Sequence, residues 1–110
     1  MKKIIILTAA MVLASAWAAS ADGGADLWTQ HCVSCHGADG KGQTKMGQHY
    51  GVKDLSDAKV QAGLTDDQIT KAIKEGVTGD DGKQKMKPFA DKLSDDDVKA
   101  LVAYVRTLKQ

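Results

Sequence analysis

The chain has few of the side chains that usually build a protein core. Its 110 residues include two Trp, two Tyr and one Phe, so aromatic residues make up only 5% of the sequence. Aromatic side chains dominate core burial, and small domains bury a smaller fraction of their surface than large ones. This length leaves room for one domain and excludes a two-domain enzyme. We therefore expect the domain to need something besides its own side chains to complete its core.

The chain also lacks an excess of charge of either sign. Lys and Arg total 15 and Asp and Glu total 14, which leaves a formal net charge of +1 at pH 7. A protein that binds nucleic acid through its phosphates needs a strongly basic surface. The near balance of charges therefore argues against nucleic acid as a partner.

Residues 1–21 have the composition of an export signal. A basic start is followed by an apolar run at 4–14 and by small residues up to Ala21, which is the order of a secretory signal peptide. Cleavage after Ala21 would leave residues 22–110 as the mature domain, exported to the periplasm and without a membrane span. The alternative is an uncleaved membrane anchor, although the apolar run is shorter than the roughly 20 residues that a membrane-spanning helix needs.

Three stretches carry helical patterns of apolar residues. The first covers residues 25–35. The second begins after Thr65, whose hydroxyl can cap a helix while Gln68 reaches back to it, and it ends at Gly76. The third begins after Ser94, and three Asp residues in its first turn lie at the positive end of the helix dipole, where they are stabilising. These helices are predicted to form the body of the domain.

The segment between the first two helices, residues 37–64, has no run of alternating β-branched residues. We expect an ordered loop there, with one short helical turn around 57–62. A loop of nearly thirty residues inside a small domain needs a group to enclose. The predicted fold class is all-α, without a sheet.

The two cysteines, Cys32 and Cys35, are too few for a disulfide framework, and His36 follows them directly. The spacing CxxCH is typical of covalent attachment of a c-type haem. Cysteines at i and i+3 leave one helical turn on the same side, so both thiols can add to the two vinyl groups of one haem. His36 is then the predicted proximal ligand of the iron. One covalently bound haem c per chain would also supply the apolar surface that the core lacks.

Other chemistry for the two cysteines fits less well. A thioredoxin-like dithiol needs a βαβ context that the sequence does not indicate. Half of a zinc site needs a second pair of ligands, and His31 and His49 do not form one. An inert pair of thiols is unusual in an exported protein.

The second axial ligand of the iron is predicted to be Met86. It lies just before the last helix, where Pro88 stiffens the chain and Phe89 offers an apolar flank. The other candidates are Met46, His49 and His31. Of these, His31 adjoins the motif on the proximal side, so we expect it to be exposed or hydrogen-bonding.

With these features the whole mature sequence resembles the short bacterial class I monohaem cytochromes c. The resemblance rests on CxxCH at 32–36, Met-x-Pro-Phe at 86–89, and Gly24, Trp28, Leu101 and Tyr104. It implies a cytochrome c-like helical domain wrapped around one haem. It also implies that the first and last helices cross, so that the glycine and tryptophan meet the leucine and tyrosine.

One departure from that family concerns the partner of the proximal histidine. Such proteins commonly have a Pro after the haem motif, whose carbonyl accepts a hydrogen bond from the histidine, but residues 37–64 contain no Pro. Gly47 or Gly51 is where we expect backbone to approach His36 instead.

A haem with protein ligands on both faces can exchange electrons but has no open position for a substrate. The predicted function is therefore a soluble periplasmic electron carrier, a monomer and not an enzyme, that performs one-electron outer-sphere transfer. Its partners would be a donor and an acceptor redox protein. Lysines near the two ligand segments would steer an acidic partner, or else belong to a solvated loop; they are Lys41, Lys45, Lys83, Lys85 and Lys87.

Three alternatives remain open from the sequence. Met86 could leave the iron easily, which would make the protein a peroxidase or a gas sensor. The chain could also be an electron-relay subunit of a larger dehydrogenase. The third alternative is a haem-free thiol–disulfide protein.

Overall fold

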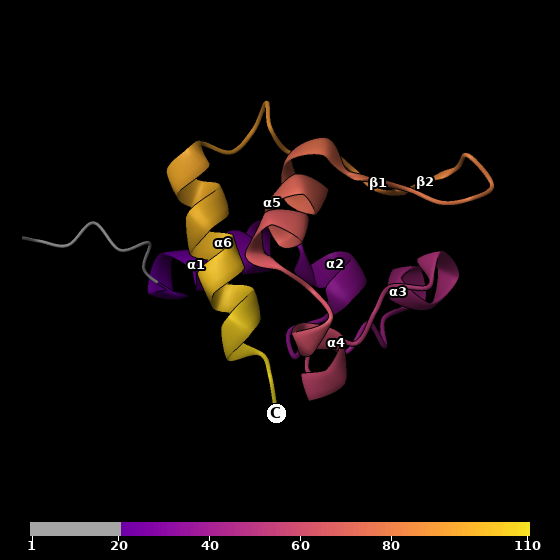
Figure 1. Ribbon diagram of the computed structural model, residues 1–110, viewed down its shortest axis with the longest axis horizontal. Helices are drawn as coiled ribbons and strands as arrows, with labels where there is room; N and C mark the ends of the chain where they lie inside the picture. Colours follow the sequence, from indigo (N-terminus) through magenta and orange to yellow (C-terminus); the bar gives the residue numbers. More distant parts are fainter. Residues whose placement is uncertain (1–20) are drawn as a thin grey trace, which may run out of the picture.

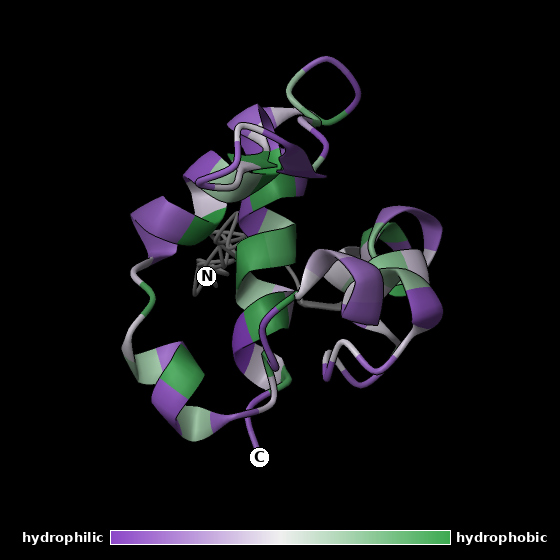
Figure 2. Ribbon diagram, turned by 90° about the vertical axis from the view of Figure 1, so that its right-hand side faces the viewer, coloured by the Kyte–Doolittle hydropathy of each residue, from purple (hydrophilic) through white to green (hydrophobic). Residues whose placement is uncertain are grey.

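The computed structural model describes residues 21–110, so the predicted signal peptide, apart from its last residue, lies outside the described residues. The elements follow in the order α1 (Ala21–His31), α2 (Val33–His36), α3 (Lys45–Tyr50), α4 (Ala58–Ala62), α5 (Asp66–Glu75), β1 (Val77–Thr78), β2 (Gln84–Met86) and α6 (Asp95–Thr107) (Figure 1). Hydrophilic and hydrophobic residues alternate in bands along the helices (Figure 2), as expected of helices that bury one side. None of the helices between residues 21 and 110 is long and apolar enough to cross a membrane.

Helices α1 and α6 cross in direct contact, as the resemblance implied (Figure 1). A Cβ atom at Gly24 would collide with the carbonyl oxygen of Ala100 and lie 2.8 Å from Cβ of Tyr104. The ring centroids of Trp28 and Tyr104 are 5.6 Å apart, and Leu101, only 1% exposed, belongs to the same core cluster as Trp28. The predicted contact between the two helices is therefore confirmed.

The starts of α5 and α6 also agree with the prediction. The Thr65 hydroxyl accepts a hydrogen bond from the Gln68 backbone N–H, and the Gln68 side chain accepts one from the Thr65 N–H. Ser94 and Asp97 make the same reciprocal pair of bonds at α6. Each cap satisfies backbone donors that the helix itself leaves free, which contributes about 1 kcal/mol.

The region between the motif and α5 is more helical than predicted. The expected turn is α4, whose cap Asp57 accepts a hydrogen bond from the Lys59 N–H at 2.8 Å. Helix α3 was not predicted, because its six residues carry no apolar stripe; Thr44 caps its start and Gly51, in the left-handed conformation, ends it. The first helix is also not continuous over 25–35, since it breaks into α1 and α2 at Cys32.

A small antiparallel hairpin corrects the prediction of a fold without a sheet. Strands β1 and β2 pair Val77 with Met86 and Thr78 with Gln84, and the hairpin extends away from the end of α5 (Figure 1). Strands of two and three residues are too short to show an alternating pattern, which is why the sequence did not indicate them. The domain is otherwise helical, in agreement with the predicted class.

Candidate haem site

One turn of backbone brings the three motif side chains together. The His36 N–H donates to the Cys32 carbonyl oxygen at 2.9 Å, so the helical turn continues past the break at Cys32. Both cysteines are free thiols, with Cys32 buried and Cys35 half-buried. His36 is half-buried. The arrangement leaves two thiols and one imidazole on a single turn, as covalent attachment of a haem requires.

Burial sets the protonation states of these groups. It raises the pKa of the Cys32 thiol to about 11, with a smaller contribution from Cys35. Burial also lowers the pKa of His36, so the imidazole is neutral at pH 7, which is the form that binds a metal. A reactive thiol needs a pKa that is lowered, whereas the pKa of Cys32 is raised.

Three consecutive carbonyl groups at the end of the motif are each held by a donor from outside it. The Thr44 hydroxyl donates to the Cys35 oxygen at 2.5 Å, the Gly42 N–H to the His36 oxygen at 2.8 Å, and the Trp28 indole N–H to the Gly37 oxygen at 3.0 Å. Contacts of Thr44 and Gly42 with the motif were not predicted, because nothing local to the motif indicates which loop residues return to it.

The second ring nitrogen of His36 has no partner. Within the described part of the chain, Nδ1 of His36 is buried and makes no hydrogen bond. Gly47, one expected site of backbone approach, packs against the motif from the Cys35 side, where its Cβ would collide with the Cys35 oxygen. Gly51, the other, lies in the open with nothing within 4 Å of where its Cβ would be. The expectation that either glycine brings an acceptor to His36 is therefore wrong in this structure.

Met86 is brought to the same core cluster as Cys32. It is half-buried at the end of β2 and packs against that cluster together with Phe89. A Cβ at Gly76 would collide with the Met86 carbonyl oxygen and lie 2.9 Å from the Pro88 nitrogen. The end of α5 therefore fits closely behind the Met86 segment because residue 76 lacks a side chain.

The other candidate ligands lie elsewhere. Met46 and His49 are both exposed on α3. His31 is half-buried, and its ring lies edge-on to Phe89 with centroids 5.7 Å apart; it is packed rather than exposed or hydrogen-bonded as expected. Across residues 21–110 no group of three or more His, Cys, Asp or Glu side chains is placed to hold a metal ion.

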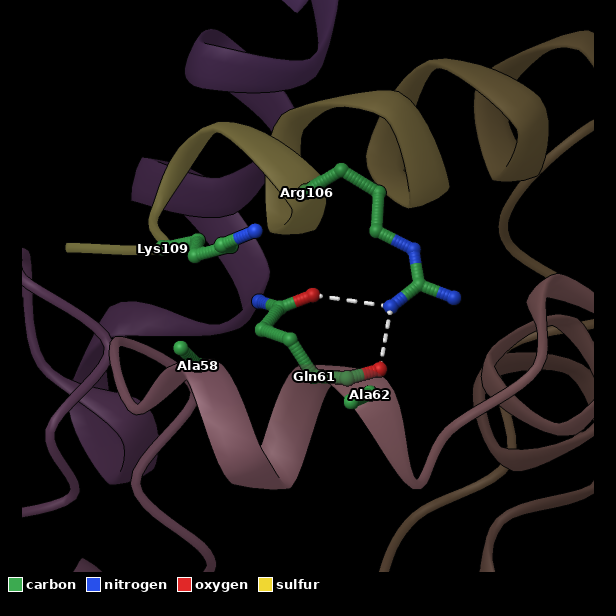
Figure 3. A pocket seen from close by; sticks show the side chains of 5 residues that line it. All are labelled: Ala58, Gln61, Ala62, Arg106 and Lys109. Carbon is green, nitrogen blue, oxygen red and sulfur yellow. Dashed lines mark hydrogen bonds between the residues drawn. The ribbon is translucent and has the colours of Figure 1, made fainter.

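A shallow pocket between α4 and the end of α6 is lined by Arg106, whose guanidinium already bonds other residues of the chain (Figure 3). The Arg106 Nη1 donates to the backbone oxygen and to Oε1 of Gln61, both at 2.9 Å. Nη2 donates to the Leu64 oxygen at 2.6 Å, and Nε and Nη2 both meet Asp66 Oδ1 at 2.9 Å. Four hydrogen bonds and one ion pair engage all three nitrogens of the guanidinium, so this pocket is a structural clamp and not a ligand site.

Comparison with known proteins gives consistent matches. The family model described as cytochrome c oxidase, cbb3-type, subunit III matches residues 19–105. Cytochrome c-553 of Nitratidesulfovibrio vulgaris is 33% identical over 114 residues, which cover 98% of this chain and 100% of the relative. The cbb3-type cytochrome c oxidase subunit FixP of Azorhizobium caulinodans is 33% identical over 85 residues, 77% of this chain, and the match spans 26% of that relative's length. The solved structure of the KustC0563 c-type cytochrome superposes with a TM-score of 0.70 at 40% identity and covers 79% of this chain and 98% of that one.

Proposed function

We propose, from the fact that this chain belongs to the cytochrome c family, that it is a periplasmic carrier which passes single electrons from one redox protein to another. As a member of that family it is an electron-carrying cytochrome with one covalently bound haem c and its iron. The ligands of the iron, the compartment and the partners are the proposed part.

Cys32 and Cys35 are the residues that would hold the haem through thioether bonds, and His36 is its proximal ligand. The observation that carries this assignment is the single turn that presents two free thiols and a neutral imidazole together. The unpaired Nδ1 leaves His36 with one nitrogen for the iron and one for a hydrogen bond. The donor set therefore fits a c-type haem.

Met86 is the proposed second ligand. Its thioether is half-buried beside the core cluster that contains Cys32, whereas Met46 and His49 are exposed on α3. His36 and Met86 would hold the iron between them and leave it no free position, and this ligand pair would raise its reduction potential. With no open position for a substrate, we expect electron transfer and not enzymatic turnover.

The ligand assignment predicts a difference between two methionine variants. The ferric protein should show the weak long-wavelength absorption band of a Met sulfur bound to iron. Met86→Ala should abolish this band, and Met46→Ala, the matched control on α3, should keep it. A band that survives in Met86→Ala would show that another side chain binds the iron.

Export to the periplasm follows from the predicted signal peptide at residues 1–21. Its removal after Ala21 would leave a mature domain of residues 22–110. The mass of the protein purified from its own cells tests this proposal and the haem together, since both change the mass of the chain. A mass that includes residues 1–21 would favour a membrane-anchored form.

A second candidate function keeps the same site within a larger assembly. The match to an oxidase subunit model, and to a segment of FixP, favours a relay of electrons inside a redox complex. The native size of the purified protein separates the two: a monomer of the mature domain favours the free carrier, and co-purification with larger redox subunits favours the relay.

A further inference from the structure

The end of helix α2 is held from several directions at once. The carbonyl oxygens of Cys35, His36 and Gly37 follow the last turn, where a helix has no N–H groups of its own to offer. The donors come from Thr44, Gly42 and Trp28, with a further bond from the Gly40 N–H to the Gly37 oxygen at 3.2 Å. Two of these donors are side chains: Trp28 precedes the motif in the sequence, and Thr44 follows it. The two carbonyls that they hold flank His36.

Thr44 ties the motif to helix α3. Its hydroxyl donates to the Cys35 oxygen and at the same time accepts a hydrogen bond from the Gly47 N–H at 2.8 Å. A hydroxyl has one hydrogen to donate, so the bond to Cys35 uses its whole donor capacity. Gly47 fits because it has no side chain, as a Cβ there would collide with the Cys35 oxygen. The start of α3 is therefore fastened to the backbone of the motif.

Trp28 contacts the motif region through both the N–H group and the ring of its indole. Its indole N–H donates to the Gly37 oxygen in a buried bond, and the ring centroid lies 5.3 Å from that of His36 with the planes tilted by 36°. The side chain is 3% exposed. A Phe at this position would keep the ring against His36 but would have no N–H to donate.

We propose that Thr44 and Trp28 are positioning residues for His36. This inference rests on the proposed function, in which His36 is the proximal ligand. A metal-binding histidine is usually oriented by a hydrogen bond from its second ring nitrogen, but Nδ1 of His36 has no partner among the described residues. The imidazole is instead oriented through the backbone on either side of it and by the indole face.

The two donors also affect the charge around the ligand. A carbonyl oxygen carries partial negative charge, and a donor hydrogen offsets part of it. Removing the Thr44 donor takes a hydrogen bond from the Cys35 oxygen, and removing the Trp28 donor leaves the Gly37 oxygen with only the longer bond from the Gly40 N–H. Either loss also loosens the packing that keeps water out. Both changes favour the ferric state, since reduction potential depends on hydrogen bonding and on solvent exposure. The midpoint potential should therefore fall when either donor is lost.

The test measures midpoint potential and unfolding midpoint on the holoprotein. Thr44→Val, which replaces the hydroxyl by a methyl group, and Trp28→Phe should each lower the potential, and Thr44→Ser should restore it. Thr65→Val makes the same chemical change at another helix cap, that of α5, and Val98→Ala truncates a core side chain of α6 that is 1% exposed. Both controls should lose stability and keep the wild-type potential.

Two results would overturn the proposal. One is a potential that stays unchanged or rises in Thr44→Val and Trp28→Phe, and the other is a fall no larger than that in the control variants. Failure of the proposed function is a separate outcome, because the wild-type protein would then lack covalent haem or the band of Met ligation.

Discussion

Gly24 shows how one residue decides whether two helices can meet. Its missing side chain allows α1 to contact the backbone of α6 at Ala100. Gly23, its neighbour, is exposed, and nothing lies within 4 Å of where its Cβ would be. Substituting each glycine by Ala therefore distinguishes the effect of close packing, at Gly24, from the effect of helix propensity, at Gly23.

Gly24→Ala should lower the free energy of unfolding by about 1–3 kcal/mol, because a methyl group forced into a packed contact displaces its neighbours. Gly23→Ala should leave stability unchanged or raise it by up to about 1 kcal/mol, since Ala favours helix over Gly. Urea denaturation of both holoproteins measures the difference. Equal effects of the two substitutions would show that the helices do not approach closely at residue 24.

At the scale of elements, α6 is joined to the chain before α5 by polar groups as well as by its core side. Gln61 is 4% exposed, and its amide N–H groups donate to the Leu55 oxygen at 2.6 Å and the Val105 oxygen at 2.8 Å. Arg106 then bonds both the side chain and the backbone of Gln61 (Figure 3). This network connects α4 to α6 without requiring a large apolar contact.

Arg106→Ala should destabilise the protein by about 2 kcal/mol, because it removes the donor from two partly buried oxygens, the Leu64 carbonyl and Gln61 Oε1. Lys109→Ala is the matched control in the same pocket, and it should change stability by less than about 0.5 kcal/mol because the side chain is exposed. Thermal or urea unfolding of the two variants gives the comparison. A loss for Arg106→Ala as small as that of the control would exclude the clamp.

The sequence predicted those elements whose signals lie in neighbouring residues. The cap of α5 was predicted because Thr65 and Gln68 lie within one turn of each other, and the start of α6 was predicted because three Asp residues follow Ser94. Helix α3 and the hairpin were missed because they have few residues and no apolar period. The hairpin instead depends on Gly76, which allows the Met86 segment to close against the end of α5.

At the scale of the whole molecule, the net charge says little about the surface that a partner meets. Lys83 and Lys87 are exposed near Met86, whereas Lys85 lies 3.4 Å from an oxygen of Asp81. The Lys83 N–H bond and the Lys85 charge also hold the pKa of Asp81 below its usual value. Asp81 thus offsets part of the positive charge that the sequence alone suggested for this loop.

If the remaining lysines steer a partner, electron exchange with anionic ferricyanide should slow several-fold as salt rises, while exchange with cationic hexaammineruthenium should not. Lys87→Glu should lower the ferricyanide rate at low salt, and Lys71→Glu on α5 should leave it unchanged. Stopped-flow measurements over a range of ionic strength give both results. A rate with ferricyanide that does not depend on salt would assign these lysines to a solvated loop.

The sequence by itself determined the features that depend on neighbouring residues. CxxCH requires only neighbours on one turn, and the helix caps and the Met86 segment are likewise local. The tertiary structure decided which distant groups hold the motif: the Thr44 hydroxyl on Cys35, the Trp28 indole on Gly37, and the close fit of α1 against α6. These contacts join residues that no local pattern relates, because they form only once the loop returns and the helices cross.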